Sequence, residues 1–478
     1  MEIRLSEKVL IKLEDELNQI SLLEMPLGGV MANFFIVDFL YGNRNWSRKK
    51  YFIDLISSLS LRYRTNRGVF SQRAGEIVPP NFGENKALLT FISSRPYLFN
   101  INFELWNLLG EDESISLIFK SDLRSKFSSK TPGAVIELAN FQAPDFQGWA
   151  KAYSAVAKDI RRVLKKFRRQ NNLSRMVTRR IQNKLMEQSQ SLYFYYGALA
   201  YLKPRYIVVE SDRYSLTSPL VVAANSLNIP TYTMMHGAVN YGFAYLPLLA
   251  DKLLCWGRQQ KQMLVKFGAD EERIAITGAP QSSNLIKGSK AEIKEKLSLK
   301  SNQRVIVLAT NPMSPEQRAG LLNIFCSVIE GNESWKGVVR LHPSEPIELY
   351  SSLIGKYKDI LFDKNQILEF DETLAVADLV CVYNSAFGLD ALFKGVPVSV
   401  INVDEEFLGQ GSDLINVGLL NESKSAEELK EFINKWANSL DFKTSYQKKC
   451  DFYASDYCAY FGREAAERSL QFFNSQFA

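Results

Sequence analysis

The sequence has few of the residues that most often hold metals and redox centres. It contains two histidines and five cysteines among 478 residues. The cysteines are scattered and form no CxxC pair, so we expect reduced, buried thiols rather than a disulfide framework. The two histidines are far apart and have no HxH or HxxE partner, which predicts that the protein holds no metal.

Long apolar runs and a secretory signal are also lacking. No stretch approaches the roughly 18 consecutive apolar residues that a membrane-spanning helix needs. The first residues, MEIRLSEKVLIKLEDEL, carry acids throughout, unlike the basic and then apolar layout of a signal peptide. We therefore expect a cytoplasmic protein, either free or peripheral at the inner face of the cell membrane.

What the chain has instead is length, apolar content and one strongly basic segment. With 46% hydrophobic and 23% charged residues, it is typical of globular proteins and too long for one ordinary core, so two domains are expected. The net charge is +6, yet residues 158–184 contain eleven Lys or Arg and one acid, which leaves −4 for the remainder. The basic character is therefore local.

Short apolar strands alternate with helices over most of the chain after residue 85, whereas the preceding part matches no clear pattern. The alternation predicts parallel sheets covered by helices on both faces. We expect an N-terminal Rossmann-like domain with helical insertions over 1–277 and a linker over 278–300. A nucleotide-binding Rossmann-like domain should follow over 301–455, and a final helix over 456–478 should cross back to the first domain.

Both histidines directly follow predicted strands. His236 precedes Gly237, which lets the backbone approach a ligand closely, and His342 precedes Pro343, which ends the strand. In open parallel sheets, ligands bind beyond the carboxyl ends of the strands. A lone histidine of this kind would be interpreted as a turn cap. Two of them, one in each half of the chain, favour a role in hydrogen bonding or proton transfer.

An acidic segment, ESDRYS, follows the strand RYIVV. Asp212 first, and Glu210 second, are placed to act as a general base or to stabilise positive charge on a reacting carbon. The alternative is that Asp212 only caps the turn before the next helix. Arg213 could pair with a phosphate or a carboxylate, because its planar fork fits both.

The clearest predicted anion site lies at 383–397, YNSAFGLDALFKGVP. Asn384 and Ser385 stand where a strand ends and a helix begins, and the free amides and dipole of such a helix favour phosphate. Asp390 lies further into the helix and could accept hydrogen bonds from ribose hydroxyls. An ordinary capped helix would explain Ser385 but not the coincidence with the other strand-end residues.

Weaker candidates follow other strands of the same series. Thr310 and Asn311 come after the strand RVIVLA, and they are predicted to lie at the same edge of the sheet. Arg340 is placed to neutralise a diphosphate, although a salt bridge at the strand edge would also explain it. Gly278 lies in the turn after the strand IAIT and is a supporting candidate.

The segments HG at 236–237, RLHP at 340–343 and NSAFGLDALFKGVPV at 384–398 together resemble the capsule polysaccharide transferases, which include Kdo transferases. More distantly they are similar to the polysialyltransferases and the CDP-glycerol glycerophosphotransferases. The resemblance covers about residues 205–405. It implies an α/β fold of the GT-B type, in which two Rossmann-like domains have parallel sheets facing across a cleft.

The resemblance also implies roles for individual residues. Arg340, His342 and Pro343 would face the donor phosphate, and Asn384 and Ser385 would contact phosphate. Asp390 would take the ribose-binding place, where the family usually has Glu, and Ala386 replaces the family's usual hydroxyl residue. His236 would lie across the cleft, near the transferred group.

From these features we expect a metal-independent glycosyltransferase that builds a bacterial capsule or lipopolysaccharide. The donor would be a CMP-sugar such as CMP-Kdo, or second a UDP-sugar, and the acceptor a surface glycan or its lipid-linked precursor. The nucleotide-sugar is a substrate, and no cofactor is expected. Two alternatives stay open. One is a non-hydrolysing nucleotide-sugar epimerase, which holds its sugar with acids and a histidine; the other is a non-catalytic, membrane-associated assembly subunit.

The basic segment 158–184 predicts a helix with one apolar and one cationic face. It could rest on an anionic membrane surface. It could also bind nucleic acid, or be a solvated face whose apolar stripe packs on the N-terminal domain. No nucleic-acid motif accompanies it, so we expect no nucleic-acid partner. We favour an inward-packed stripe with cations that face the membrane.

Overall fold

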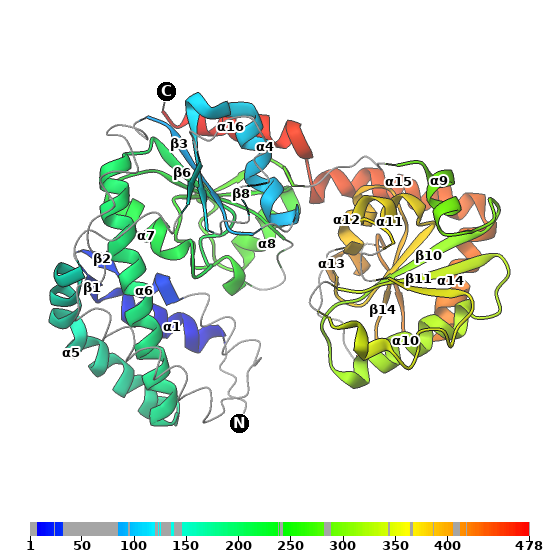
Figure 1. Cartoon of the computed structure of the whole chain (residues 1–478), viewed down its shortest axis with the longest axis horizontal. Coiled ribbons are helices and arrows are strands. Elements are labelled where there is room, and N and C mark those ends of the chain that lie inside the picture. Colours follow the sequence, from blue (N-terminus) through cyan, green and yellow to red (C-terminus); the bar gives the residue numbers. More distant parts are fainter. Residues whose placement is uncertain are drawn as a thin grey trace. The chain divides into compact units, whose positions relative to one another are not determined.

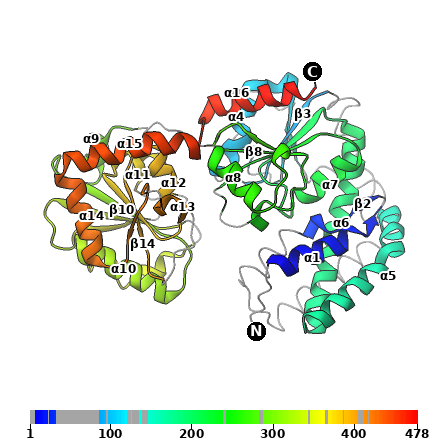
Figure 2. The ribbon, with the colours of Figure 1, turned by 180° about the vertical axis from the view of Figure 1, so that it is seen from behind.

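The computed structural model divides into two units, which Figures 1 and 2 show from opposite sides. The N-terminal unit comprises Met1–Trp256, Gln260–Gln281 and Gly462–Ala478, and the C-terminal unit comprises Gly257–Gln259 and Ser282–Phe461. The structure describes residues 7–22, 24–31, 85–93, 96–119, 123, 125, 135–137, 146–237, 239, 242–281, 288–342, 345–363, 367–385, 387–404, 412–416 and 418–477. Pro343, Ala386 and most of the unassigned first 85 residues lie outside this part.

The N-terminal unit is built on a parallel sheet of seven strands in the order β5-β4-β3-β6-β7-β8-β9. The strands are short, and those at the centre of the sheet are buried along their whole length, as expected where helices cover both faces. They are β3 (Ala87–Phe91), β4 (Ser114–Ile118), β5 (Val135–Glu137), β6 (Tyr206–Val209), β7 (Thr231–Met234), β8 (Lys252–Cys255) and β9 (Ile274–Ile276). A separate antiparallel pair joins β1 (Ser21–Leu22) and β2 (Met25–Pro26).

Helices pack against both faces of this sheet, because alternate residues of a strand point to opposite sides. In β6, Ile207 and Val209 join one hydrophobic cluster, while Tyr206 and Val208 join another. The first cluster receives α1 (Glu7–Asn18), α5 (Phe146–Gln170), α6 (Arg175–Leu202) and α7 (Ser218–Ser226). The second receives α4 (Pro96–Glu113) and α16 (Gly462–Ser475).

The last helix of the chain belongs to the N-terminal unit. Both ribbon views show α16 beside α4. The ring of Phe473 on α16 lies 4.5 Å, between centroids, from that of Tyr232 in β7. The unit is completed by α8 (Arg258–Lys266), which follows β8.

The C-terminal unit contains a parallel sheet of six strands in the order β12-β11-β10-β13-β14-β15. The strands are β10 (Arg304–Ala309), β11 (Trp335–Arg340), β12 (Ile360–Asp363), β13 (Leu379–Val382), β14 (Val398–Ile401) and β15 (Asn421–Ser423). The helices are α9 (Lys290–Lys296), α10 (Pro315–Ile329), α11 (Phe370–Val376), α12 (Phe387–Phe393), α13 (Ser412–Asn416), α14 (Ala426–Asn438) and α15 (Leu440–Tyr457). The predicted α/β fold with two parallel sheets is confirmed.

All five cysteines are free and buried. None of the helices in the described part of the chain combines the length and the apolar composition needed to cross a membrane.

A buried ion pair fastens the first helix to the N-terminal sheet. Arg213, in the loop after β6, donates from both terminal nitrogens to the carboxylate of Glu14 on α1, over 2.6 and 2.9 Å. Arg213 is 1% exposed and Glu14 is 0% exposed. Arg213 also donates to the carbonyl oxygen of Pro247 over 3.1 Å. The pair therefore joins three segments that are distant in the sequence.

We expect Glu14→Ala to lower the free energy of unfolding of the N-terminal unit by about 3–5 kcal/mol, because it leaves a buried guanidinium without its counter-charge. Glu16→Ala, on the same helix, is the matched control. Its pair with Lys166 is partly exposed to solvent, so the loss should be about 0.2–1 kcal/mol. Urea unfolding followed by tryptophan fluorescence measures both. Equal losses in the two variants would contradict the interpretation. The double variant Glu14→Leu, Arg213→Leu removes both buried charges, so it would also contradict the interpretation if it were less stable than Glu14→Ala.

Candidate functional site

The strand order of the C-terminal sheet reverses next to β10. The chain passes from β10 to β11 and β12 on one side, and then returns to β13, β14 and β15 on the other. Ligands of open parallel sheets bind at such a reversal, outside the carboxyl ends of the strands. Asn311 follows β10 here, and Asn384 and Ser385 follow β13. The backbone N–H of Asn384 donates to Oδ1 of Asn311 over 3.3 Å, so the two loops meet.

His342 is held in place by a buried carboxylate. Its backbone N–H donates to Oγ1 of Thr310 over 3.0 Å. Thr310 in turn donates to Glu345 over 2.5 Å, and the hydroxyl of Tyr350 donates to the same carboxylate over 2.9 Å. Thr310 and Glu345 are each 2% exposed, whereas His342 is half-buried. Thr310 therefore positions the loop, and the His342 ring is the group at its surface. Sequence reasoning missed Glu345, which no motif marks.

Arg340 is engaged by the helices that follow it. Its guanidinium packs against the rings of Phe370 and Phe387, 5.6 and 5.7 Å from their centroids. It also donates to Oγ1 of Thr373 over 2.6 Å and to the carbonyl oxygen of Leu368 over 3.3 Å. Burial lowers the pKa of Arg340. These contacts give Arg340 a packing role, and its contact with a diphosphate stays a prediction.

Asp390 is a carboxylate that accepts no hydrogen bond from the described residues around it. It is half-buried on α12. Burial raises the pKa of Asp390 to about 7, with Lys394 opposing and Asp371 adding to the shift. The ammonium of Lys394 pairs with Asp371 over 3.0 Å instead. Asp390 is thus available as a hydrogen-bond acceptor for a ligand.

The raised pKa of Asp390 makes a prediction about stability. The folded state binds the Asp390 proton more tightly than the unfolded chain, whose pKa is about 4, so wild-type stability falls as the pH rises from about 4 through 7. Asp390→Asn removes this dependence. We therefore compare the melting temperature of Asp390→Asn with that of wild type at each pH. The difference, variant minus wild type, should be larger at pH 8.5 than at pH 4.5. Scanning calorimetry measures the difference. Asp441→Asn, at an exposed carboxyl on α15, is the control, and an equal pH trend in both variants would contradict the assignment.

The strand order of the N-terminal sheet reverses between β3 and β6, and Glu210 bridges this point. Its carboxylate accepts from the backbone N–H of Ile92 over 3.1 Å and from the hydroxyl of Thr90. Glu210 is fully buried, and burial raises its pKa to about 8. Glu210 therefore connects the two strands at the ligand-binding edge, and its side chain points into the protein.

His236 lies beside Glu210, two residues beyond the end of β7. Its Nδ1 is 3.1 Å from the carbonyl oxygen of Glu210. A carbonyl oxygen only accepts, so Nδ1 carries the proton and Nε2 presents a lone pair. The ring lies between those of Tyr214 and Tyr245, at 5.2 and 5.5 Å between centroids. Burial lowers the pKa of His236 to about 4, so the ring is neutral at pH 7.

The remaining candidates of the N-terminal unit, Asp212, Arg213 and Gly278, have roles in holding loops of the fold. Oδ2 of Asp212 accepts from the backbone N–H groups of Leu249 and Ala250 over 2.7 and 2.9 Å. Asp212 is 0% exposed, so it holds this loop where a general base was expected. Arg213 is committed to Glu14, in place of a phosphate. Gly278 has φ +93°, which favours glycine.

Gly237 exchanges hydrogen bonds with Tyr245, whose hydroxyl donates to the Gly237 carbonyl over 2.6 Å. The nearest atom to a side chain added at Gly237 would be that hydroxyl, at 3.8 Å. The position therefore has room on its open side, next to His236. Sequence reasoning missed both tyrosines around His236. Tyr214 lies in the same ESDRYS segment, whereas nothing in the sequence marks Tyr245.

No protein-family model matches the sequence, and no curated protein matches it. Solved structures do match the fold. A protein from Listeria monocytogenes assigned to the UDP-N-acetylglucosamine 2-epimerases is 17% identical, with a TM-score of 0.56 over 83% of this chain and 97% of that one. A UDP-GlcNAc 2-epimerase from Neisseria meningitidis bound to UDP-GlcNAc is 13% identical, with a TM-score of 0.54 over 82% and 100%. The glycotransferase of kitacinnamycin is 12% identical, with a TM-score of 0.55 over 83% and 100%.

The chain has the GT-B fold. This finding agrees with one implication of the resemblance to capsule polysaccharide transferases, namely the fold. It gives no support to membership of the Kdo-transferase family, or to a part in capsule or lipopolysaccharide synthesis.

The comparisons overturn the main prediction of function. The expected transfer of a sugar from a CMP-activated donor is wrong, because the similar GT-B structures are chiefly UDP-GlcNAc 2-epimerases. They favour the alternative that the sequence left open, a nucleotide-sugar epimerase. The glycotransferase among them shows that the fold itself is compatible with more than one reaction.

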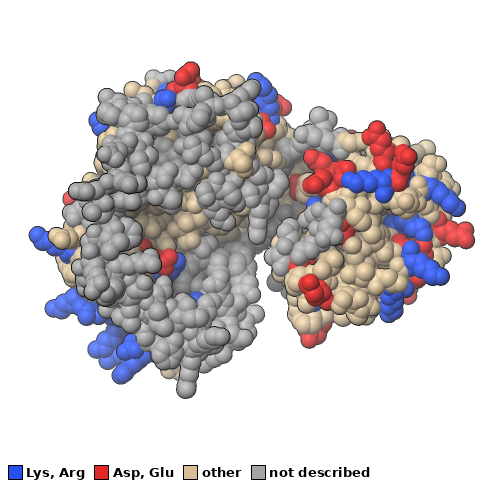
Figure 3. All heavy atoms as spheres, viewed as in Figure 1, with Lys and Arg blue, Asp and Glu red and all other residues tan. Residues whose placement is uncertain are grey.

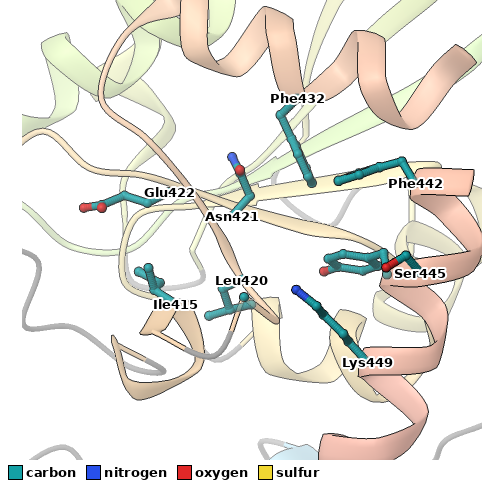
Figure 4. Close-up of a pocket in the computed structure, with 10 residues that line it drawn as sticks. Ile415, Leu420, Asn421, Glu422, Phe432, Phe442, Ser445 and Lys449 are labelled. Atoms are coloured by element: carbon teal, nitrogen blue, oxygen red, sulfur yellow. The ribbon is translucent and has the colours of Figure 1, made fainter. Parts of the chain in front are cut away.

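A pocket of about 300 Å³ lies elsewhere in the C-terminal unit, at the amino end of the edge strand β15. Figure 4 shows Lys449 and the rings of Phe432 and Phe442 turned into it. An added side chain at Gly418 would come within 3.1 Å of the Lys449 ammonium. This is the opposite end of the sheet from Asn311, His342 and Asn384, so the pocket is separate from the strand-end site.

Proposed function

We propose that the protein is a nucleotide-sugar epimerase with a GT-B fold, acting on a UDP-sugar. The observation that carries the proposal is that each sheet presents a half-buried histidine, two residues beyond a strand that neighbours the reversal of strand order. Similar structures whose names include UDP or UDP-GlcNAc support the nucleotide class.

In this proposal the C-terminal unit binds the nucleotide. Asn311, His342, Asn384 and Ser385 are half-buried, so their polar groups can contact a ligand while the strands hold them fixed. A diphosphate would receive hydrogen bonds from the amide and hydroxyl donors that follow β13. Because α12 has only seven residues, the proposal depends on these side chains rather than on a helix dipole. Ionised Asp390 would accept from the ribose hydroxyls.

His236 would act on the sugar. Epimerisation removes a proton from one face of a sugar carbon and returns a proton to the other, so a group with an available lone pair is required. Nε2 of His236 has that lone pair, because Nδ1 is bonded to the Glu210 carbonyl. The ring stays neutral above about pH 5, given its lowered pKa of about 4. Asp212 and Glu210 would then support His236 and its loop rather than touch the sugar.

The nucleotide assignment predicts a binding defect confined to one edge of the C-terminal sheet. His342→Ala and Asn384→Ala should each weaken UDP binding by about 10-fold or more, because a hydrogen bond to a charged group contributes about 1.5–3 kcal/mol. Ser327→Ala, at an exposed position on α10, is the control. Calorimetric titration measures the affinities, and thermal shifts with UDP, CMP, CDP and GDP compare the nucleotides. Unchanged UDP affinity in both variants would overturn the assignment.

The reaction itself is tested by incubating the protein with UDP-GlcNAc in D₂O without any acceptor. We expect the C2 epimer, with deuterium at the inverted carbon, because the abstracted proton exchanges with solvent. His236→Gln should lower kcat by about 100-fold or more and leave UDP affinity within about twofold of wild type. UDP binding without any turnover of UDP-GlcNAc would contradict this epimerase reaction, as would full activity of His236→Gln.

A further inference from the structure

We propose that the N-terminal unit docks on an anionic membrane surface through a basic platform, formed by Lys158, Arg161, Lys165 and Arg169 of α5 and by Arg175 at the start of α6. This inference concerns a part of the chain that the proposed function does not use, and it holds or fails independently of the reaction. It depends on the arrangement, pairing and surroundings of these cations.

The platform lies opposite the face by which α5 joins the core. Ile160, Leu164 and Phe167 are buried in the cluster on one side of the N-terminal sheet. The cations at 158, 161, 165 and 169 are spaced by three, four and four residues, so they form one stripe along the helix. Turning by 100° per residue places this stripe on the side of α5 that faces away from the buried residues. All four side chains are exposed.

In the described part of the chain, the charge of this stripe is not neutralised by acids. The acids near it pair with cations at its margin, Asp159 with Arg162 over 2.8 Å and Glu16 with Lys166 over 2.7 Å. Among the residues that the structure describes, no acid forms an ion pair with Lys158 or Lys165. Figure 3 shows the Lys and Arg side chains gathered over the α5 region of the N-terminal unit. Such a concentration of one charge attracts a surface of the opposite charge.

The chemistry of the platform favours lipid headgroups over nucleic acid. Proteins that bind single-stranded nucleic acid stack bases on aromatic side chains between their cations. Of the large apolar side chains exposed in the described residues, none lies on α5, and Tyr201 at the far end of α6 is the one on either helix. An anionic headgroup layer needs neither stacking nor base contacts, and clusters of four to eight Lys or Arg on an amphipathic helix are typical of binding to it. Because none of the side chains that the structure describes on α5 is an exposed apolar anchor, the binding should be electrostatic and sensitive to salt.

The test is flotation of the full-length protein with vesicles of phosphatidylcholine containing 30% phosphatidylglycerol. The test variant replaces Lys158, Arg161, Lys165 and Arg169 with Gln. The matched control replaces four exposed lysines elsewhere, Lys266, Lys300, Lys430 and Lys448, with Gln and so removes the same charge. Melting temperatures within a few degrees of wild type establish that both variants are folded. Pure phosphatidylcholine vesicles, a salt series, duplex DNA and poly(U) complete the comparison.

We expect wild type and the control variant to float with the anionic vesicles at low salt, and not at 0.5 M salt or with neutral vesicles. The platform variant should bind more than about 100-fold more weakly, at roughly fivefold for each cation. The proposal is overturned if wild type does not float. It is equally overturned if both variants lose binding to the same degree, or if DNA or poly(U) binds more tightly than the vesicles and displaces them.

Discussion

The reversal of strand order beside the first strand of each parallel sheet is the constraint on which this structure depends. Parallel pairing places all carboxyl ends of the strands at one edge, and the reversal separates two neighbouring loops there. In the N-terminal unit, the gap is bridged by Glu210, which reaches Ile92 across 118 residues of sequence. In the C-terminal unit, Asn311 and Asn384 meet across 73 residues. Polar groups that are remote in the sequence are thereby gathered at each edge.

Burial decides which of these polar groups remain available to a ligand. A fully buried charge is costly without a partner, and the most deeply buried candidates accordingly hold the structure together. Arg213 pairs with Glu14, Asp212 accepts from two loop amides, and Glu210 accepts from the backbone N–H of Ile92. The half-buried groups His236, His342 and Asp390 stand at the surface of the same edges. Partial burial also shifts their chemistry, since it leaves His236 neutral and Asp390 near the midpoint of its titration at pH 7.

Short motifs in this chain predict the class of ligand but not the reaction. Strand-end histidines and a polar turn before a helix describe the binding of a nucleotide-linked ligand, and that chemistry is common to sugar transfer and sugar epimerisation on one fold. The resemblance of these segments to capsule polysaccharide transferases therefore pointed to the correct fold and to a transfer reaction that the comparisons with solved structures do not support. The difference between the two reactions lies in which groups touch the sugar carbon, and short motifs do not encode that.

The sequence by itself determined the alternation of elements. Runs such as RYIVV and RVIVLA predict buried parallel strands, the spacing of Ile160, Leu164 and Phe167 predicts the buried face of α5, and the residues that follow each strand predict the ligand-binding edge. It did not reveal α4, whose eighteen residues are apolar on several sides, nor the short edge strands β12 and β15. Only the tertiary structure decided what each polar residue does. Whether Arg213 meets a phosphate or Glu14 depends on where α1 packs. The proton position on His236 depends on the carbonyl of Glu210, directly after the neighbouring strand β6. Those contacts are long-range, so no local pattern of residues contains them.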